Sequence, residues 1–374
     1  MSGAPAMIPA GSPALTVVLD AFWWASGPHS LRHVQREIIL AWQRLYPDDH
    51  LVLITRAGAE VASEDLGPNT SIVPTRLWPH AIAATRTARR VAAANRADAI
   101  LTHNFATRSR GTVSGIYLHD VLFQTNPEWF TRVERGYFSR MIAWARRADV
   151  VFTSTTSEAR RIERAAGLSD AFPVGLGLST ELIGVQPDAD SSLEPGAFVL
   201  TVGRLNARKN LQTVIRAAAR SRAVSPASPL VIVGTPDGSR EELDATLNAE
   251  GCRESVRFTG HVSDARLSWL YSNCGAFICL SRGEGFGMPP VEAAFFGAPV
   301  VVSDLPVFHE TLGVGARFVD PDDADAAAVA IDESVGECTP AAERHDLSRR
   351  HDWDRTVRSI RSALSRRGPV SAAA

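Results

Sequence analysis

The sequence predicts an α/β protein with two doubly wound, parallel-sheet domains, and three observations support this prediction. Short apolar segments alternate with helical segments along the chain, as in parallel sheets that helices cover on both faces. The alternation restarts after a polar, proline-containing stretch at residues 186–196. A chain of 374 residues also exceeds the size at which one hydrophobic core usually stops growing. We therefore expect a central ligand cleft between the carboxyl ends of the strands of the two halves.

The first half begins with an apolar, β-branched strand in residues 14–22. The loop WASGPHS and a helix over residues 32–45 follow it. Further strands are expected in LVLIT, SIVPT, DAILTHN, GTVSGIYLHD and DVVFTST, and FPVGLGL closes this half. Two more helices are expected over residues 82–96 and 129–147.

The second half contains five short apolar strands, each of which ends in Gly, Ser or Asp before a helical segment. These strands are FVLTVG, PLVIVG, SVRFTG, GAFICLS and PVVVSD. The last helix is expected to start near Asp352 or Trp353. The predicted organisation is a disordered tail (1–14), a first domain (15–180), a linker (181–196), a second domain (197–350) and a C-terminal helix (351–374) that packs back on the first domain.

Composition indicates a globular protein of the cytoplasm. Hydrophobic residues make up 45% of the chain and charged residues 21%, with a mean hydropathy of -0.04. We find no apolar run of the roughly 18 residues that a spanning helix needs, and the opening residues lack the features of a secretory signal. The four cysteines show neither zinc-site nor disulfide-framework spacing, which fits reduced thiols. The net charge of -2 combines +4 for residues 1–178 with -6 for the remainder. A basic half could contact anionic lipid or nucleic acid, but a difference this small is more often surface variation, so we expect no nucleic-acid partner.

The segment GRLNARKN, from Gly203 to Asn210, combines features that suit a phosphate group. It lies where a strand ends and a helix is expected to begin, so free N–H groups and the positive end of a helix dipole are available. Arg204 can grip two phosphoryl oxygens with its planar guanidinium, and Lys209 adds a compact charge. Lys209 is also the only lysine in the chain. The alternative is a pair of solvated charges at a helix start.

The segment SRGEGFGMPPVEAAFFGAPVVVSD, residues 281–304, places a glycine-rich turn between a strand and a helix expected to open at Pro289 or Pro290. Gly285 and Gly287 let the backbone approach a ligand closely. The amides expected to line an oxyanion or hydroxyl site are those of Phe286, Gly287 and Met288.

Two glutamates in the same segment are candidates for binding a diol. Glu284 lies in the turn and Glu292 is expected in the first helical turn, so both can reach one cleft. A carboxylate accepts hydrogen bonds from the vicinal hydroxyls of a ribose or hexose. Alternatively, Glu292 only complements the helix dipole.

These segments, together with APVVVS at residues 298–303, resemble glycosyltransferase family 4, which comprises retaining enzymes of the GT-B fold with two Rossmann-like domains. The match covers residues 198–320 in spacing, residue type and context. The first half, which is the acceptor side in this family, matches more loosely, and its best piece is YLHDVLFQTNPEWF at residues 117–130.

The resemblance implies a role for each matching residue. Arg204 and Lys209 would hold the donor diphosphate, and Glu292 would bind the nucleotide ribose. Glu284 and the backbone from Gly285 to Met288 would hold hydroxyls of the transferred sugar, and His119 would contact that sugar from the other domain. Gly27 occupies the family's phosphate-approaching loop, but the family's glycine pair is missing there. A His-Asp pair after a strand is also a common structural arrangement, which is the alternative for His119.

The reaction implied is transfer of a hexose or deoxyhexose from a nucleotide diphosphate sugar to a saccharide or lipid-linked saccharide. Charge on the departing diphosphate would be stabilised by Arg204, Lys209 and helix N-termini, which requires no metal or other cofactor. The Asp-x-Asp triplets at residues 188–190 and 323–325 lie in polar linker or helix-cap sequence, so we interpret them as solvated turns. A nucleotide-sugar epimerase or hydrolase of the same fold and a non-catalytic nucleotide-sugar-binding module remain alternatives.

The helix expected over residues 82–96 carries arginines that are candidates for contact with a membrane surface. Arg86, Arg89, Arg90 and Arg96 share this helix with small apolar neighbours. The pattern suits either weak peripheral contact with the inner face of a membrane that carries a lipid-linked acceptor, or a solvated arginine face.

Overall fold

A computed structural model of the chain describes residues 13–62, 65–235 and 240–366. The tail expected to be disordered, residues 1–14, lies outside the described residues except for Pro13 and Ala14. Two compact units emerge from the contacts within the chain. The first unit contains residues 1–118, 140–152 and 357–374, and the second contains residues 119–139 and 153–356. The domain boundaries expected from the sequence stay a prediction.

A seven-stranded sheet has the order β3-β2-β1-β4-β5-β6-β7, and neighbouring strands from β3 to β6 run parallel. Its strands are β1 (Thr16–Asp20), β2 (His50–Arg56), β3 (Thr70–Thr75), β4 (Ala99–His103), β5 (Val113–Tyr117), β6 (Val150–Thr153) and β7 (Ala171–Pro173). Strands β4, β5 and β6 are buried at every residue, which explains why their sequences are continuous apolar runs rather than alternating ones.

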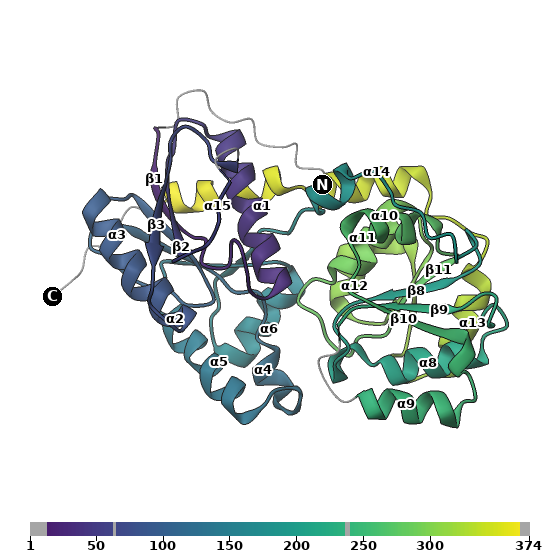
Figure 1. The fold of residues 1–374 in the computed structure, drawn as a ribbon. Helices are drawn as coiled ribbons and strands as arrows, with labels where there is room; N and C mark the ends of the chain where they lie inside the picture. Colours follow the sequence, from purple (N-terminus) through teal and green to yellow (C-terminus); the bar gives the residue numbers. More distant parts are fainter. Residues whose placement is uncertain (1–12, 63–64, 236–239, 367–374) are drawn as a thin grey trace. The chain divides into compact units, whose positions relative to one another are not determined.

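Helices alternate with the strands along this part of the chain (Figure 1). They are α1 (His29–Leu45), α2 (His80–Ile82), a π-helical turn η2 (Ala83–Thr87), α3 (Ala88–Asn95), α4 (Leu122–Thr125), a 3-10 turn η3 (Pro127–Trp129), α5 (Arg132–Ala145), α6 (Thr156–Ala166) and α7 (Thr180–Gly184). The helix expected over residues 129–147 begins only at Arg132. The Thr131 hydroxyl accepts from the Glu134 amide and the Glu134 carboxylate accepts from the Thr131 amide, so a capping box fixes this start.

A six-stranded parallel sheet has the order β10-β9-β8-β11-β12-β13. Its strands are β8 (Val199–Val202), β9 (Leu230–Val233), β10 (Val256–Gly260), β11 (Ala276–Cys279), β12 (Val300–Ser303) and β13 (Ala316–Val319). The five strands expected from the sequence are present. The sequence analysis missed the sixth, β13, because this four-residue edge strand is only half-buried and includes Arg317.

Helices and 3-10 turns lie between the strands of this second sheet and, in sequence, after its last strand. They are η4 (Ala207–Lys209), α8 (Leu211–Arg220), α9 (Arg240–Ala249), η5 (Arg253–Ser255), α10 (Asp264–Asn273), α11 (Met288–Phe296), α12 (Pro306–Leu312), η6 (Gly313–Gly315), α13 (Ala324–Ser334), α14 (Ala341–Arg350) and α15 (Trp353–Arg366). The predicted start of the last helix is confirmed at Trp353. None of the helices in the described ranges is both long enough and apolar enough to cross a membrane.

From Val357 onward, α15 belongs to the first unit, and a buried ion pair holds it there. Arg361 donates two hydrogen bonds to Asp49, from Nε to Oδ2 at 2.7 Å and from Nη2 to Oδ1 at 2.8 Å. The Trp42 indole also donates to Asp49, over 2.8 Å. Helix α15 is therefore joined to α1 and to the residue that precedes β2.

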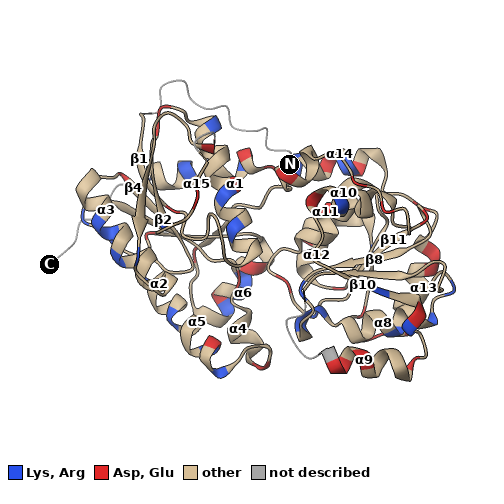
Figure 2. Cartoon of the chain, viewed as in Figure 1, with Lys and Arg blue, Asp and Glu red and all other residues tan. Residues whose placement is uncertain are grey.

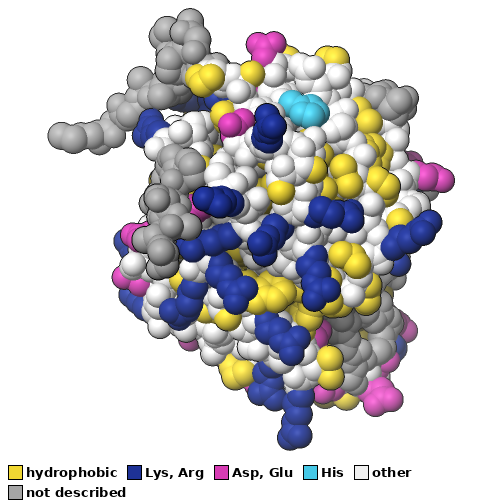
Figure 3. Space-filling model, turned by 90° about the vertical axis from the view of Figure 1, so that its left-hand side faces the viewer, with side chains coloured by type: hydrophobic (Ala, Val, Ile, Leu, Met, Phe, Trp, Pro, Cys, Tyr) yellow, Lys and Arg dark blue, Asp and Glu magenta, His cyan; other side chains and the backbone are white. Residues whose placement is uncertain are grey.

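Charge is divided unequally between the two units. The first unit carries 18 arginines against 9 acidic residues, a formal charge of +9, whereas the second carries 21 basic against 32 acidic residues, a formal charge of -11. The exposed arginines of α3 and Arg140 of α5 contribute to this basic character (Figure 2). Figure 3 shows one face on which basic side chains gather with hydrophobic atoms between them.

Candidate active site

Lys209 is brought to the end of β8 by two local features. Gly203 has φ +150°, and a Cβ on this residue would lie 2.9 Å from Lys209 Cε, so the lysine stem lies directly on the glycine. The Asn206 side chain accepts a hydrogen bond from the Lys209 amide and caps the turn η4. Helix α8 starts only at Leu211, which is later than the expected helix start within this segment. Arg204 is exposed in the loop that precedes the turn.

The carboxylate of Glu284 lies at the centre of the site. Lys209 Nζ contacts Glu284 Oε1 at 2.7 Å, and Arg208 Nη1 contacts Glu284 Oε2. Glu284 is only 6% exposed. Burial raises the pKa of Glu284, but the charges of Arg208 and Lys209 overcome this effect and hold the pKa at about 2. The carboxylate is therefore ionised at every physiological pH and can accept hydrogen bonds from hydroxyl groups.

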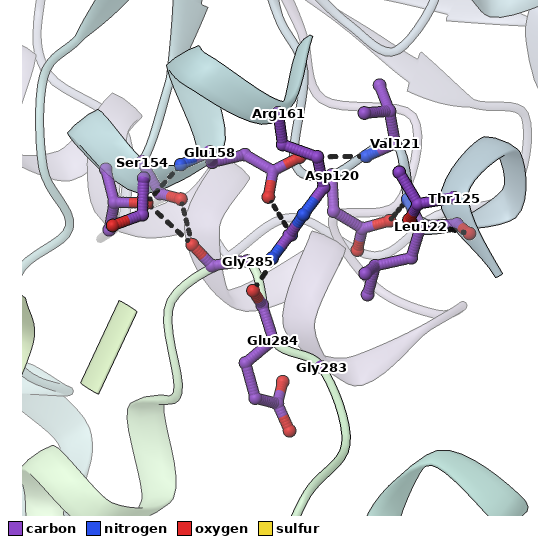
Figure 4. Close-up of polar contacts among 12 residues, drawn as sticks. Asp120, Val121, Leu122, Thr125, Ser154, Glu158, Arg161, Gly283, Glu284 and Gly285 are labelled. Atoms are coloured by element: carbon purple, nitrogen blue, oxygen red, sulfur yellow. Dashed lines mark hydrogen bonds and ion pairs between the residues drawn. The ribbon is translucent and has the colours of Figure 1, made fainter. Parts of the chain in front are cut away.

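The Gly285 backbone is enclosed on both sides. The Ser154 and Thr155 hydroxyls donate to the Gly285 carbonyl over 2.9 Å and 3.0 Å (Figure 4). A Cβ on Gly285 would lie 2.7 Å from the His119 carbonyl oxygen. The structure thus brings the His-Asp segment after β5 into contact with the glycine-rich turn, and both belong to the second unit. His119 is half-buried there.

The glycine-rich turn leads into α11 at Gly287. This residue has φ +86°, and a Cβ on it would lie 2.4 Å from the Phe308 ring, so only glycine fits. The helix starts at Met288, one residue before the first expected position. The Phe286 ring packs edge-on against His351, with 5.3 Å between ring centroids. Because Pro289 and Pro290 carry no N–H, the amides at this helix start are those of Phe286, Gly287 and Met288, and such amides suit an oxygen-rich ligand.

Glu292 lies in the second turn of α11, so the expectation of a first-turn position was wrong. The first turn contains no acidic residue, which removes the helix dipole as an explanation for Glu292. The side chain is buried, and Oε2 accepts a hydrogen bond from the Tyr271 hydroxyl over 3.0 Å. Burial raises the pKa of Glu292 to about 7. This carboxyl group can therefore change its charge near neutral pH.

Gly27 belongs to the first unit. It has φ +129°, and a Cβ on it would lie 2.1 Å from the Trp23 ring, so local packing alone explains the glycine. Its expected role in donor binding stays a prediction.

Residues that the sequence analysis did not select also surround the turn. Arg208 was overlooked beside Lys209, although it binds both the Glu284 carboxylate and the Gly283 carbonyl. Glu158 and Arg161 on α6 were overlooked as well. The spacing Thr155-x-x-Glu158 is typical of a capping box, in which the glutamate serves its own helix. In the structure, Glu158 Oε1 instead accepts from the Val121 amide over 2.9 Å.

The two Asp-x-Asp triplets bind protein groups. Asp188 and Asp190 both pair with Arg266, at 2.7 Å and 2.8 Å. Asp323 caps α13, and Asp325 pairs with Arg220 at 3.0 Å. Across the described part of the chain, no three His, Cys, Asp or Glu residues form a group that could hold a metal ion.

The second unit matches a known protein family. The family model described as glycosyl transferases group 1 matches residues 187–350, which include every donor-site candidate except His119 and Gly27. Residues 187–350 are therefore similar to the glycosyl transferases of group 1. The family named from the sequence is thus confirmed at the level of this group.

Relatives of this group 1 domain are named as mannosyltransferases. The chain is 33% identical to the O-antigen chain mannosyltransferase RfbU of Salmonella typhimurium over 170 residues, which are 45% of this chain and 47% of that protein. It is 29% identical to the GDP-mannose:cellobiosyl-diphosphopolyprenol alpha-mannosyltransferase of Komagataeibacter xylinus over 173 residues, 44% of each protein. The chain therefore spans about half the length of these curated relatives or less.

Solved structures share the fold of both sheets. Sucrose-phosphate synthase from Thermosynechococcus elongatus aligns with a TM-score of 0.70 at 18% identity, covering 93% of this chain and 98% of that one. The Anabaena protein HepE in complex with UDP and glucose aligns with a TM-score of 0.68 at 17% identity, covering 94% and 99%. The prediction of the GT-B fold, with two Rossmann-like parallel sheets, is confirmed.

Proposed function

We propose that this protein is a retaining glycosyltransferase that moves a hexose from a nucleotide diphosphate sugar to a saccharide or lipid-linked saccharide. One observation carries the proposal. An ionised, buried Glu284 pairs with Lys209 and Arg208 at the end of β8, and the next residue, Gly285, touches the backbone of His119. A carboxylate for sugar hydroxyls and cations for a diphosphate thus lie together.

The transferred sugar is proposed to be mannose, carried by GDP. The support is that the relatives of the group 1 domain are named as mannosyltransferases and that one of them is named for GDP-mannose. Glu292, buried beside Tyr271 on α11, is the proposed acceptor of hydrogen bonds from the ribose hydroxyls.

In the proposed reaction, the bond between the anomeric carbon and the diphosphate oxygen breaks as the acceptor oxygen attacks from the same face. The leaving phosphate takes the proton of the acceptor hydroxyl. Arg204, Lys209 and the amides of residues 286–288 stabilise the negative charge that develops on the diphosphate. Because these groups supply the positive charge, we propose that transfer needs no metal ion. Undiminished turnover in excess EDTA is the expected result, and loss of turnover restored by Mg²⁺ would contradict it.

The basic first unit is proposed to contact anionic lipid where a lipid-linked acceptor is presented. Arg86, Arg89, Arg90 and Arg96 are all exposed on or just after the stretch formed by α2, η2 and α3. Each basic side chain near an anionic surface contributes about 1 kcal/mol. Co-sedimentation with vesicles containing phosphatidylglycerol should exceed that with neutral vesicles and should fall when Arg86, Arg89 and Arg90 are changed together to Gln. Equal background values with both vesicle types would remove this part of the proposal.

A panel of nucleoside diphosphates and their sugars tests the donor assignment. A ligand that binds only the folded protein raises the apparent melting temperature. GDP and GDP-mannose should give the largest shifts, and a larger shift with UDP-glucose would reassign the donor. Incubation of the donor with and without acceptor alcohols then separates the rival functions. An epimerase or hydrolase consumes the donor without an acceptor, and a binding module consumes it in neither case.

A further inference from the structure

Glu158 and Arg161 form a buried contact that lies between two parts of the candidate site. Arg161 Nη1 contacts Glu158 Oε2, and these side chains are 23% and 0% exposed. Both residues lie on α6, one helical turn apart, and Figure 4 shows them between the Val121 amide and the glycine-rich turn. The contact therefore lies between the segment that contains His119 and the turn that contains Glu284.

Each side chain of this pair has a second partner from a distant part of the sequence. Glu158 Oε1 accepts from the Val121 amide over 2.9 Å, and Val121 is two residues after His119. Arg161 Nη1 donates to the Glu284 carbonyl over 3.0 Å. The pair thus forms a continuous chain of polar contacts from the His119–Val121 segment to the backbone of Glu284.

The start of helix α6 is held by hydrogen bonds to two other segments, so the helix can fix the position of groups that bind to it. The Glu310 carboxylate, on α12, accepts from the Thr156 and Ser157 amides over 2.6 Å and 2.8 Å. A carboxylate at the start of a helix satisfies free amides and complements the dipole. Just before α6, Ser154 and Thr155 hold the Gly285 carbonyl. The glycine-rich turn therefore receives hydrogen bonds at two successive carbonyls from one short segment.

Arg161 and the two cations of the site bind different parts of Glu284. It binds the main chain of Glu284, whereas the Glu284 carboxylate is bound by Lys209 and Arg208. Burial raises the pKa of Glu158 to about 8, although Arg161 opposes this effect. Burying this carboxyl group costs free energy, which the hydrogen bond from the Val121 amide and the contact with Arg161 offset in part.

We propose that Glu158 and Arg161 are positioning residues that hold the Glu284 backbone and the His119 segment in register for sugar transfer. This inference rests on the proposed function, since it assigns the pair to the geometry of that same site. A displacement of about 1 Å at a reacting centre can lower a rate about 100-fold. The nucleotide would still bind, because the pair holds the Val121 amide and the Glu284 main chain, whereas Lys209 and Glu292 are the proposed ligands of the diphosphate and the ribose.

The first test compares Arg161→Met with Arg164→Met, an exposed arginine of the same helix. We expect kcat for transfer to fall about 100-fold in Arg161→Met, with the Kd for GDP unchanged, and Arg164→Met to resemble the wild type. Arg161→Lys, which keeps the charge and a donor, should recover part of kcat. A wild-type kcat in Arg161→Met would overturn the proposal, as would a loss of GDP binding in step with kcat.

A second measurement keeps the inference separate from the proposed function. Hydrogen exchange at the amides of residues 284–288 in the ligand-free protein should become faster in Arg161→Met and in Glu158→Ala, but not in Arg164→Met. Unchanged exchange in both variants would overturn the positioning role whether or not the protein transfers sugar. If the wild type turns over no nucleotide sugar while exchange responds as expected, the proposed function fails and the physical link between the segments stands.

Discussion

The carbonyl oxygen of His119 lies 2.7 Å from the position that a Cβ on Gly285 would occupy. A real Cβ essentially never approaches a heavy atom that closely, so the two segments of backbone meet only because residue 285 is glycine. Since the residue before Gly285 is the ionised Glu284, this approach sets the distance between the His-Asp segment and the proposed sugar-binding carboxylate.

Gly285→Ala should therefore separate these segments and lower turnover about 100-fold, because the methyl group meets backbone that cannot move aside cheaply. The matched control is Gly136→Ala in α5, where a Cβ meets nothing within 4 Å. This control should keep full activity and gain roughly 0.5–1 kcal/mol in helix stability. Steady-state transfer assays and urea unfolding of both variants check the prediction. Full activity in Gly285→Ala would show that the close approach is not needed.

His119→Ala should lower kcat about 100-fold while leaving GDP affinity unchanged, because the residue is proposed to contact the sugar and not the nucleotide. His345→Ala, an exposed histidine on α14, is the control and should behave as the wild type does. Transfer kinetics and calorimetric titration with GDP measure both quantities. A near-normal kcat in His119→Ala would remove this residue from the site.

Nucleotide affinity should depend on pH through Glu292. Burial raises the pKa of this group in the folded protein to about 7, and ribose hydroxyls donate better to the ionised carboxylate. Binding therefore favours proton release, and the Kd for GDP should rise about tenfold as the pH falls from 8 to 6.

Glu292→Gln is the comparison for this pH dependence, since ionisation of the phosphates affects both proteins equally. The extra dependence of the wild type should be absent from the variant. Parallel Kd curves for the two proteins would show that Glu292 does not bind the nucleotide.

The buried ion pair between Arg361 and Asp49 predicts a large effect on stability. Arg361→Met removes both hydrogen bonds to Asp49 and leaves that buried carboxylate without a cation. The free energy of unfolding should fall by about 3 kcal/mol. Arg366→Met, at the exposed end of the same helix, makes the same change in net charge and should have little effect. Urea unfolding curves that coincide for the two variants would contradict this role of α15.

Local sequence patterns predicted the strands and selected the candidate donor residues because their signals lie within short windows. Lys209 and Glu284 each follow a buried strand, and parallel strands bring such positions to one edge of a sheet. Strand β13 escaped prediction because four half-buried residues at a sheet edge carry little periodicity. Glu292 was placed one turn too early because the helix starts at Met288 rather than at a proline.

The links around the glycine-rich turn could not be read from local patterns. Glu158 bonds to a residue 37 positions away, and Arg161 bonds to one 123 positions away. In sequence, the spacing Thr155-x-x-Glu158 is satisfied by the helix itself, so nothing indicates that Glu158 serves another segment. Arg208 and Lys209 are adjacent cations, and only the fold shows that they bind opposite oxygens of one carboxylate.

The proposal that this protein transfers sugar from a nucleotide diphosphate is tested most directly by the rate at which GDP is released from GDP-mannose in the presence of a saccharide acceptor. The wild type should release GDP with formation of the glycosylated product. Lys209→Ala should be about 100-fold slower, because it loses a cation at the diphosphate and at Glu284, while Arg220→Ala on α8 should match the wild type. Equal rates in Lys209→Ala and the wild type, or no turnover of any nucleotide sugar by the wild type, would contradict the account.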